Sequence, residues 1–319
     1  MPAITCWHWI AFVAGVLIFL ALDLRVFHRQ ARVEGPRSAL LWTVVWFGLA
    51  MLFALGLKSW HGPKEALEFV TGYLIEASLS IDNVFVIALI FAYFAIPAHL
   101  QHRVLFWGIL GALIMRGAMI GAGLALVSRL GWVLHLFGAF LLYSGVKLLL
   151  VPSRVRPEKN KIVQLARRFC AVAPSLDGEK FTTAWQGRRA LTPLALVLLT
   201  IETTDLIFGL DSIPAVFAVT TKPFIVFTSN IFAVLGLRSL FFVLAGAVRS
   251  FRYMKIGISV VLAFFGIKML LDPHEQPPRW FQLQIPISVS LLAVGGILLL
   301  SVALSLAARQ PEKRDGGAP

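Results

Sequence analysis

The stretch from Leu191 to Thr220 reads LTPLALVLLTIETTDLIFGLDSIPAVFAVT. It is largely apolar, and at about 1.5 Å per helical residue it is longer than a hydrocarbon core of roughly 30 Å. Three acids, Glu202, Asp205 and Asp211, interrupt the run. Charged groups at membrane depth face protein or water and usually mark an ion or substrate pathway. Because Pro214 follows Asp211 closely, the stretch predicts a membrane helix that breaks around Asp211.

An earlier stretch repeats this pattern. Residues 73–94 read YLIEASLSIDNVFVIALIFAYF, which is again apolar but contains Glu76 and Asp82. Aligning Asp82 with Asp211 places Glu76 over Asp205, so both acidic pairs are six residues apart. On an unbroken helix that spacing turns the second acid about 120° away from the first. We therefore expect local unwinding in both helices, which would let the acids converge on one ligand.

The composition is that of a membrane protein with several spans. The chain has 319 residues, of which 58% are hydrophobic, and a mean hydropathy of +0.82. The basic residues behind the formal net charge of +13 lie mostly in short loops between apolar runs. That pattern orients membrane helices and argues against nucleic-acid binding. The two cysteines, Cys6 and Cys170, fall on opposite sides of the expected topology and form no CxxC motif.

Nine apolar runs predict an all-α polytopic membrane protein that forms a single transmembrane domain over 1–319. The expected spans are 7–27, 39–57, 66–94, 104–127, 131–150, 191–211, 224–247, 254–271 and 285–307. One side of this topology carries 20 Lys and Arg residues, many of them in 152–190, and the other side carries five. Because cytoplasmic loops are rich in basic residues, 152–190 is expected to be a basic cytoplasmic loop. The protein would then lie in the cytoplasmic (inner) membrane, with its N-terminus outside and its C-terminus in the cytoplasm.

Basic residues inside the apolar runs indicate an internal repeat. One match aligns Arg116 with Arg238, in the segments GALIMRGAMIGAG and VLGLRSLFFVLAGA. A second match aligns Lys147 with Lys268, in the segments FLLYSGVKLLLVP and LAFFGIKMLLDP. Residues 66–150 and 191–271 are therefore interpreted as two copies of one three-helix unit. Because three is odd, the second copy enters the membrane from the opposite side. This predicts an inverted repeat, with a site between the two units near the middle of the membrane.

The acids and their polar neighbours define a candidate ion site. Its expected ligands are Glu76, Asp82, Asn83, Glu202, Asp205, Asp211 and Ser212, with Ser80 and Asn230 as further oxygen donors. An all-oxygen set suits Mg²⁺, Ca²⁺ or Mn²⁺ and disfavours Cu⁺ or a thiolate zinc site. Five carboxylates against Arg116 and Arg238 leave a formal deficit of three positive charges, which a divalent cation plus a proton would neutralise. We expect this ion to be transported, with no permanent cofactor.

Three other interpretations stay open. The acids could pair with arginines and lysines as buried salt bridges, and charge balance is the favoured role of Arg116 and Arg238. Two intramembrane aspartates could form a protease dyad, but Phe208–Asp211 lacks the second glycine of the Gly-x-Gly-Asp motif. The sequence also lacks nucleophile-elbow, zinc-protease and P-loop motifs, so an enzyme is not expected. A membrane scaffold with a structural ion is the third alternative, and the sequence leaves any protein partner unknown.

Three segments closely resemble the TerC/Alx family of integral membrane proteins. They are EASLSIDNVFV at 76–86, ETTDLIFGLDSIPAVFAVT at 202–220 and SNIFAVLGLRSLFF at 229–242. ALDLRVFHR at 21–29 is similar to the family's first-helix motif and adds Asp23 as a candidate. The resemblance implies a relation to LysE-type transporters and links to manganese efflux and tellurium resistance. It also implies that the acidic and polar positions of these motifs carry the ion.

Export of a divalent cation is therefore the expected function, because an acid-lined cavity would repel the tellurite anion. The expected ion is Mn²⁺ and the expected coupling is to protons. A Ca²⁺/H⁺ exchanger, or a scaffold linked to tellurium resistance and metal homeostasis, is the alternative, because carboxylate ligands accept several divalent ions. The expected partners are a divalent metal ion, protons and the lipid bilayer.

Overall fold

The computed structural model describes residues 4–27, 36–150, 164–165, 168–245, 253–272 and 285–308, with 21–27, 36, 245 and 306 described by their backbone alone. These residues form nine helices and one small sheet. Eight of the helices are long and apolar enough to cross a membrane. The ninth, α1 (Cys6–Phe27), has a described apolar segment from Cys6 to Leu20. The polytopic helical fold predicted from the sequence is confirmed.

The other helices are α2 (Pro36–His61), α3 (Pro63–Tyr93), α4 (Ala98–Arg129), α5 (Val133–Leu150), α7 (Pro193–Phe217), α8 (Pro223–Ala245), α9 (Met254–Leu271) and α10 (Ile287–Ala307). Four of them, α2, α3, α7 and α8, begin with a proline. Its fixed φ angle suits the first helical turn, where its missing N–H would have no helical partner. Between α2 and α3 the chain turns at Gly62, whose φ of 103° favours glycine.

The predicted helix break is wrong. α7 continues through Asp211 and Pro214 to Phe217, and α3 continues through Asp82 to its end at Tyr93. Pro214 removes one backbone hydrogen bond, but neighbouring helices and hydroxyl side chains compensate for such losses inside membrane bundles. Because the helices are unbroken, the second acid of each pair stays about 120° around the helix from the first.

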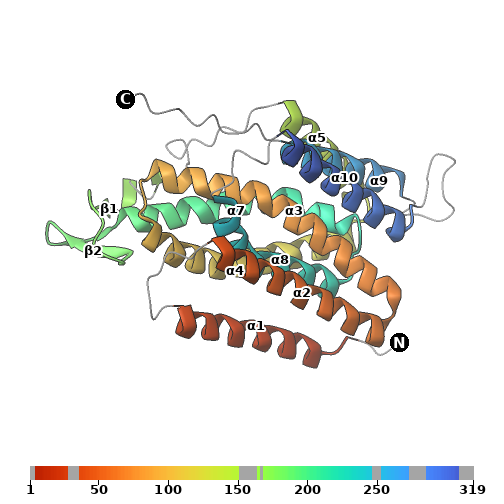
Figure 1. Ribbon diagram of the computed structural model, residues 1–319, viewed down its shortest axis with the longest axis horizontal. Coiled ribbons are helices and arrows are strands. Elements are labelled where there is room, and N and C mark those ends of the chain that lie inside the picture. The colour runs from red at the N-terminus through yellow and green to blue at the C-terminus, as the bar shows by residue number, and fades with distance from the viewer. Residues whose placement is uncertain are drawn as a thin grey trace, which may run out of the picture.

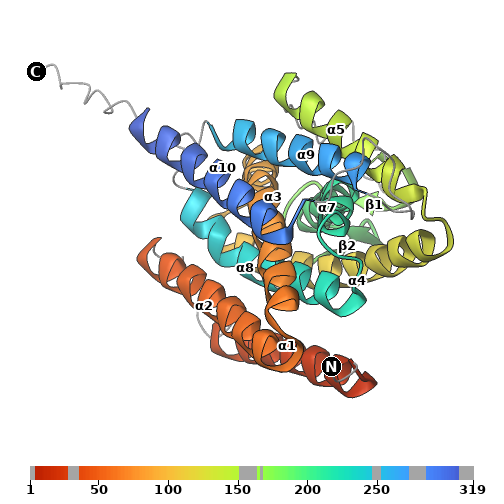
Figure 2. The same ribbon diagram turned by 90° about the vertical axis from the view of Figure 1, so that its right-hand side faces the viewer.

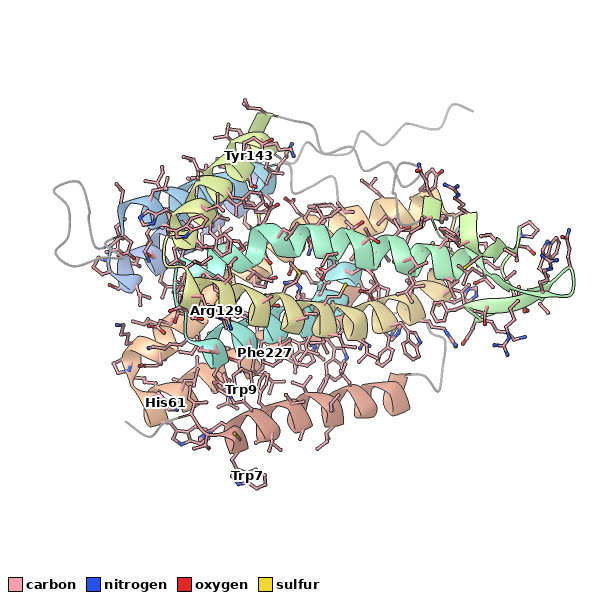
Figure 3. All side chains as sticks on the ribbon, turned by 180° about the vertical axis from the view of Figure 1, so that it is seen from behind. Trp7, Trp9, His61, Arg129, Tyr143 and Phe227 are labelled. Carbon is pink, nitrogen blue, oxygen red and sulfur yellow. The ribbon has the colours of Figure 1, made fainter. Side chains whose placement is uncertain are left out.

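Helices α3 and α7 lie at the centre of the bundle (Figure 1), and Figure 2 shows them nearly end-on. α4 and α8 pack against them on one side, and α5, α9 and α10 lie on the other. α2 packs against α3 and α8 at the edge of the bundle. Figure 3 shows that Trp7 of α1 points away from the bundle, whereas Trp9 lies toward Phe227 of α8, with 5.3 Å between the ring centroids.

The most extensive helix contact in the described chain joins α5 to α9, and glycines allow it. A Cβ atom at Gly266 would lie 2.6 Å from the backbone nitrogen of Leu142 and 2.8 Å from the carbonyl oxygen of Gly138. At Gly145 it would lie 2.8 Å from the carbonyl oxygen of Ser259. Small residues let membrane helices approach closely enough for backbone packing, so these glycines fix α5 against α9.

Two contacts show that α3 and α7 run in opposite directions. Asn83 donates to Asp205 near one end of the contact, and a Cβ atom on Gly72 would touch Val216 near the other. An inverted repeat would produce this arrangement, but the repeat itself stays a prediction. Lys147 and Lys268, which the repeat aligns, lie in different environments. Lys147 is exposed beside the Tyr143 ring, whereas Lys268 is 3% exposed and its Nζ donates to Ser290 Oγ at 3.0 Å.

The expected loop 152–190 contains a small sheet that the sequence analysis missed. Its strands are β1 (Ala171–Val172), β2 (Thr182–Trp185) and β3 (Arg188–Leu191), in the order β1-β3-β2. β2 and β3 form a hairpin whose two turn residues, Gln186 and Gly187, both have positive φ angles. A two-residue turn of this kind matches the twist of the strands, so the Gln-Gly pair was the available signal.

Side chains attach this sheet to the start of α4. Arg103 Nη1 lies 2.6 Å from Glu179 Oε2, and its guanidinium group lies 5.6 Å from the centre of the Phe181 ring. Within the sheet region, Thr183 donates to Asp177 at 2.7 Å. This hydrogen bond and the charge of Lys180 hold the pKa of Asp177 below its usual value. The sheet is therefore docked on the helical bundle at the end where α7 begins.

At the opposite end of α7, a charged cluster joins α3 to the α7–α8 connection. Lys222 Nζ lies 2.7 Å from Glu65 Oε1 and 3.1 Å from Glu68 Oε2, and Thr220 Oγ1 donates to Glu68 at 2.8 Å. Glu68 is buried, whereas the Lys222 side chain is 40% exposed. Burial alone would lower the pKa of Lys222, but its hydrogen bonds with the two glutamates raise that pKa above the ordinary value. We call Glu65, Glu68, Thr220 and Lys222 the Lys222 clamp.

The natural cysteines provide a test of the topology. Cys6 at the start of α1 and Cys170 beside β1 are both exposed, at opposite ends of the bundle (Figure 1). In intact cells, a membrane-impermeant maleimide is expected to label the Cys170→Ser protein, which retains Cys6. The Cys6→Ser protein is expected to react only after the membrane is permeabilised. The opposite pattern of labelling would overturn the expected orientation.

Removal of the Lys222 ammonium should destabilise the fold. Lys222→Met leaves Glu68 buried without its cation, and we expect the free energy of unfolding to fall by about 1–2 kcal/mol. This is less than for a fully buried pair, because Lys222 is 40% exposed. Because the pKa of Lys222 is raised in the folded protein, its stabilising effect is complete below the ordinary lysine pKa of about 10.4. The effect is lost as the pH rises through the raised pKa of Lys222. Denaturant unfolding at neutral pH measures the effect, and an equal loss for the exposed Lys64→Met control would contradict it.

Candidate functional site

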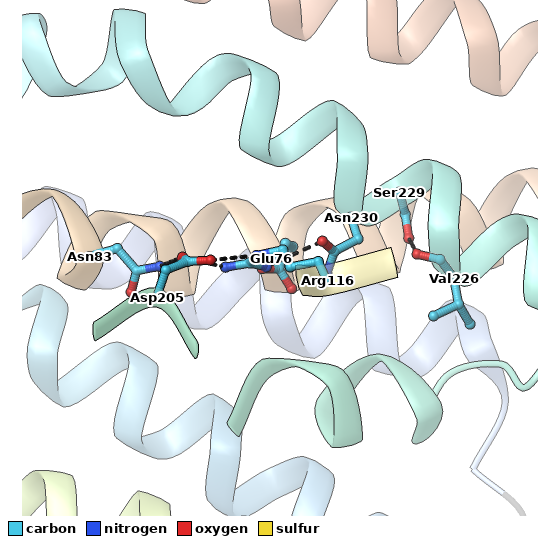
Figure 4. Close-up of polar contacts among 7 residues, drawn as sticks. All are labelled: Glu76, Asn83, Arg116, Asp205, Val226, Ser229 and Asn230. Atoms are coloured by element: carbon cyan, nitrogen blue, oxygen red, sulfur yellow. Dashed lines mark hydrogen bonds and ion pairs between the residues drawn. The ribbon is translucent and has the colours of Figure 1, made fainter. Parts of the chain in front are cut away.

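Arg116 of α4 is the centre of a buried polar network (Figure 4). It is 1% exposed and is the largest fully buried side chain in the described chain. Its guanidinium group forms an ion pair with Glu76 of α3. It also binds both carboxylate oxygens of Asp205 of α7, through Nε at 3.2 Å and Nη2 at 3.0 Å. Nη1 donates to Asn230 Oδ1 of α8 at 3.2 Å, so four helices meet at one side chain.

The charges of this network do not balance. Glu76 and Asp205 carry two negative charges in their ionised forms, against the single positive charge of Arg116. Charges taken out of water are costly unless they are paired, and removal of one partner of a buried pair typically destabilises a protein by roughly 3–5 kcal/mol. The two acids therefore require a cation at this position, and Arg116 supplies one.

Neutral oxygen and nitrogen atoms surround the charged groups. Asn83 Nδ2 donates to Asp205 Oδ1 at 3.3 Å, and the antiparallel register of α3 and α7 places Ser212 opposite Glu76. Four uncharged buried atoms on these helices lack a hydrogen-bond partner among the described residues, namely Ser80 Oγ, Asn83 Oδ1, Ser212 Oγ and Asn230 Nδ2. Buried polar groups are nearly always bonded, so these atoms are suited to bind a water molecule or a ligand.

A small cavity adjoins Asp205 on the side of the network nearer the sheet. Its volume is about 20 Å³, which is room for about one water molecule. Its polar lining comes from Asn83, Thr204, Asp205 and Arg238, and the remaining lining residues are apolar or glycine. The lining residues on α4 come before Arg116, and those on α3 come after Glu76. The cavity therefore lies toward the end of the bundle that carries the sheet. Thr204 was not predicted as a site residue, because threonine is common in membrane helices.

The other predicted ligands lie outside the Arg116 network. Asp211 is half-buried and accepts a hydrogen bond from Ser144 of α5 at 2.8 Å, a contact that the sequence analysis missed. Asp82 is half-buried on α3 and interacts electrostatically with Lys255 of α9. Glu202 is half-buried between α7 and α4, where its carboxylate occupies the space beside Gly111. The side chain of Asp23 lies outside the described residues.

The structure thus separates the predicted acids into two sets. Glu76 and Asp205 share Arg116, while Asp82, Glu202 and Asp211 lie elsewhere on the same two helices. Among the described residues, no three carboxylate, imidazole or thiolate groups come together as a metal cluster. The expectation that five carboxylates meet in one cavity is therefore wrong for this conformation, because the helices are not broken at the acids. Their roles as ion ligands stay predictions.

Comparison with known proteins places this architecture in a family. Residues 61–313 match the model of the "Integral membrane protein TerC family". An uncharacterized membrane protein of Myxococcus xanthus is 49% identical over 314 residues, which cover 98% of this chain and 96% of that protein. Proteins named "Putative membrane-bound redox modulator Alx" are also similar. The one from Photorhabdus laumondii is 44% identical, over 93% of this chain and 94% of its own length.

The Alx protein of Escherichia coli is 42% identical over 308 residues, which cover 93% of each chain. No solved structure matches the chain. The family match extends from the start of α3 past the end of α10, and it includes every residue of the Arg116 network. The chain belongs to the TerC family of integral membrane proteins.

Proposed function

We propose that this protein exports a divalent metal cation, Mn²⁺ by preference, from the cytoplasm in exchange for protons. The observation that carries the proposal is the meeting of two buried carboxylates from separate helices, Glu76 and Asp205, in the middle of the bundle. Ionisable residues at membrane depth are costly and typically mark ion pathways. The relation to LysE-type transporters, implied by the sequence resemblance, belongs to the same proposal.

The chemistry of the donors supports a hard divalent cation. Around Arg116 the available ligands are carboxylate, amide and hydroxyl oxygens from Glu76, Asn83, Asp205, Ser212 and Asn230. Such oxygens suit Mn²⁺, Mg²⁺ and Ca²⁺. Carboxylates must be deprotonated to bind a metal, so metal binding and proton release are coupled. An inward proton gradient would then drive the cation outward.

Three alternatives accompany this proposal. A Ca²⁺/H⁺ exchanger would use the same oxygen ligands. A scaffold linked to tellurium resistance would use the network only for stability. A redox role, as the names of the Alx relatives state, would need a redox-active group. The two cysteines lie at opposite ends of the bundle, so they cannot form a dithiol pair within one chain.

The proposed setting follows from the charge bias of the loops. We place the protein in the cytoplasmic membrane, with the sheet and the C-terminus in the cytoplasm. Its proposed partners are the divalent ion, protons and the lipid bilayer, and it is neither an enzyme nor a nucleic-acid-binding protein in this account. Direct transport of tellurite is not proposed, because two carboxylates against one guanidinium group disfavour an anion.

Proteoliposomes that contain the purified full chain and a trapped metal-sensitive dye test the transport directly. A pH gradient is expected to drive Mn²⁺ flux in the wild-type protein, and Asp205→Asn should reduce this flux by roughly tenfold or more, because it removes a charged ligand. Glu179→Gln, which removes a carboxylate from the sheet region, is the matched control with unchanged flux. Flux of Ca²⁺ alone would favour the calcium exchanger, and the absence of any divalent flux would contradict transport.

The same assay tests the two acids outside the network. Asp82→Asn and Asp211→Asn keep the shape of each side chain but remove its charge, and each is expected to abolish transport while the protein remains in the membrane. Quantitative blotting of the membrane fraction separates lost transport from lost protein. Normal flux in either variant would show that its carboxylate is structural.

A further inference from the structure

Arg116 and a divalent cation compete for the same carboxylates. Arg116 donates to both oxygens of Asp205 and forms an ion pair with Glu76, so it already occupies the positions that a metal ion would use. With Arg116 in place, a divalent ion would bring the local charge to one positive unit at a buried position. Without it, one divalent ion neutralises the two carboxylates. Because the guanidinium group already takes both oxygens of Asp205, and because two adjacent buried cations repel each other, the two cations compete for this position.

A displaced guanidinium group needs another buried acceptor, and Glu202 provides one. Glu202 lies one helical turn before Asp205 on α7, at a rise of about 4.5 Å. Its Oε2 atom is buried and has no hydrogen-bond partner among the described residues. The sequence analysis assigned this acid to the metal, whereas in the structure it lies one turn from Asp205 and outside the contacts of Arg116.

The direction of the Arg116 side chain favours this second position. α4 and α7 run parallel, because Gly111 of α4 adjoins Glu202 and Gly123 further along adjoins Phe217. Helical side chains lean toward the N-terminus of their own helix, which for Arg116 is the direction of Gly111 and Glu202. Gly111 leaves the space that the Glu202 carboxylate fills, since a Cβ atom there would overlap it. Because Gly111 is five residues before Arg116, the guanidinium group has to move both along α4 and around it by about 140° to reach Glu202.

We propose that Arg116 is a resident cation that the transported metal ion displaces from Glu76 and Asp205 onto Glu202. This inference rests on the proposed function and deepens it. In the first arrangement Arg116 pairs with both central carboxylates, and Glu202 Oε2 has no hydrogen-bond partner among the described residues. In the second arrangement the metal ion binds Glu76 and Asp205, while ionised Glu202 pairs with Arg116. The central acids thus always have a cation beside them.

Mn²⁺ binding to the full chain in detergent, measured from the loss of the free-ion electron paramagnetic resonance signal, tests this exchange. Glu202→Gln is expected to raise the Kd for Mn²⁺ by roughly tenfold in the wild-type background, because the displaced guanidinium group loses its acceptor. Arg116→Gln is expected to lower the Kd by a similar factor, because the competing cation is gone. In the double variant, Glu202→Gln should have no further effect. Arg129→Gln, an exposed arginine on the same helix, is the matched control.

The outcomes separate the alternatives. If Glu202→Gln weakens binding equally with and without Arg116, Glu202 is a metal ligand and the exchange is overturned. If Glu202→Gln has no effect in either background, the acceptor role is also overturned. If the wild-type protein and its variants bind no Mn²⁺, the proposed function itself fails.

Stability measurements keep the test decisive if Arg116→Gln folds poorly. The metal ion should replace the missing charge, so Mn²⁺ is expected to raise the Tm of Arg116→Gln more than that of the wild-type protein. If Arg116→Lys restores folding and Mn²⁺ does not stabilise Arg116→Gln, the network is a structural ion pair that metal cannot replace. That result would overturn the proposal.

Discussion

The interaction on which this structure depends is the pairing of one buried guanidinium group with two carboxylates. Arg116 forms ion pairs with Glu76 of α3 and Asp205 of α7, and it donates a hydrogen bond to Asn230 of α8. In the interior of a membrane bundle none of these charges can be left unpaired, so the ion pairs fix the rotation and depth of α3, α4 and α7 together. Two further contacts support this arrangement. Asn83 sets the register of α3 on α7, and the Lys222 clamp holds the far end of the same two helices.

The same pairing links stability to function. A protein that only needed stability would gain as much from apolar residues at these positions, because replacement of buried ion pairs by well-packed hydrophobic residues is often neutral or stabilising. Two acids held by a single cation form a site with one excess negative charge, next to a small cavity and an acid without a hydrogen-bond partner at Glu202 Oε2. In the exchange proposed above, this asymmetry would let the internal cation give way to an external one.

The helical spans could be predicted from the sequence, because apolar length is a local signal. Charge balance by Arg116 was also predictable, since so few basic residues lie inside the apolar runs. The break at Asp211 was predicted wrongly, because Pro214 is tolerated when neighbouring helices surround it. The choice of Glu76 and Asp205 over Asp82 and Asp211 as partners of Arg116 could not be predicted. It depends on the rotation of unbroken helices, which tertiary packing decides. The sheet at 171–191 was hidden by its very short strands.

Anomalous X-ray diffraction at the manganese absorption edge, from crystals of the full chain with saturating Mn²⁺, tests the central claim most directly. The account predicts an anomalous peak between the carboxylates of Glu76 and Asp205, with the Arg116 guanidinium group moved to Glu202. A structure in which Arg116 still binds both carboxylates while Mn²⁺ occupies another position would contradict it.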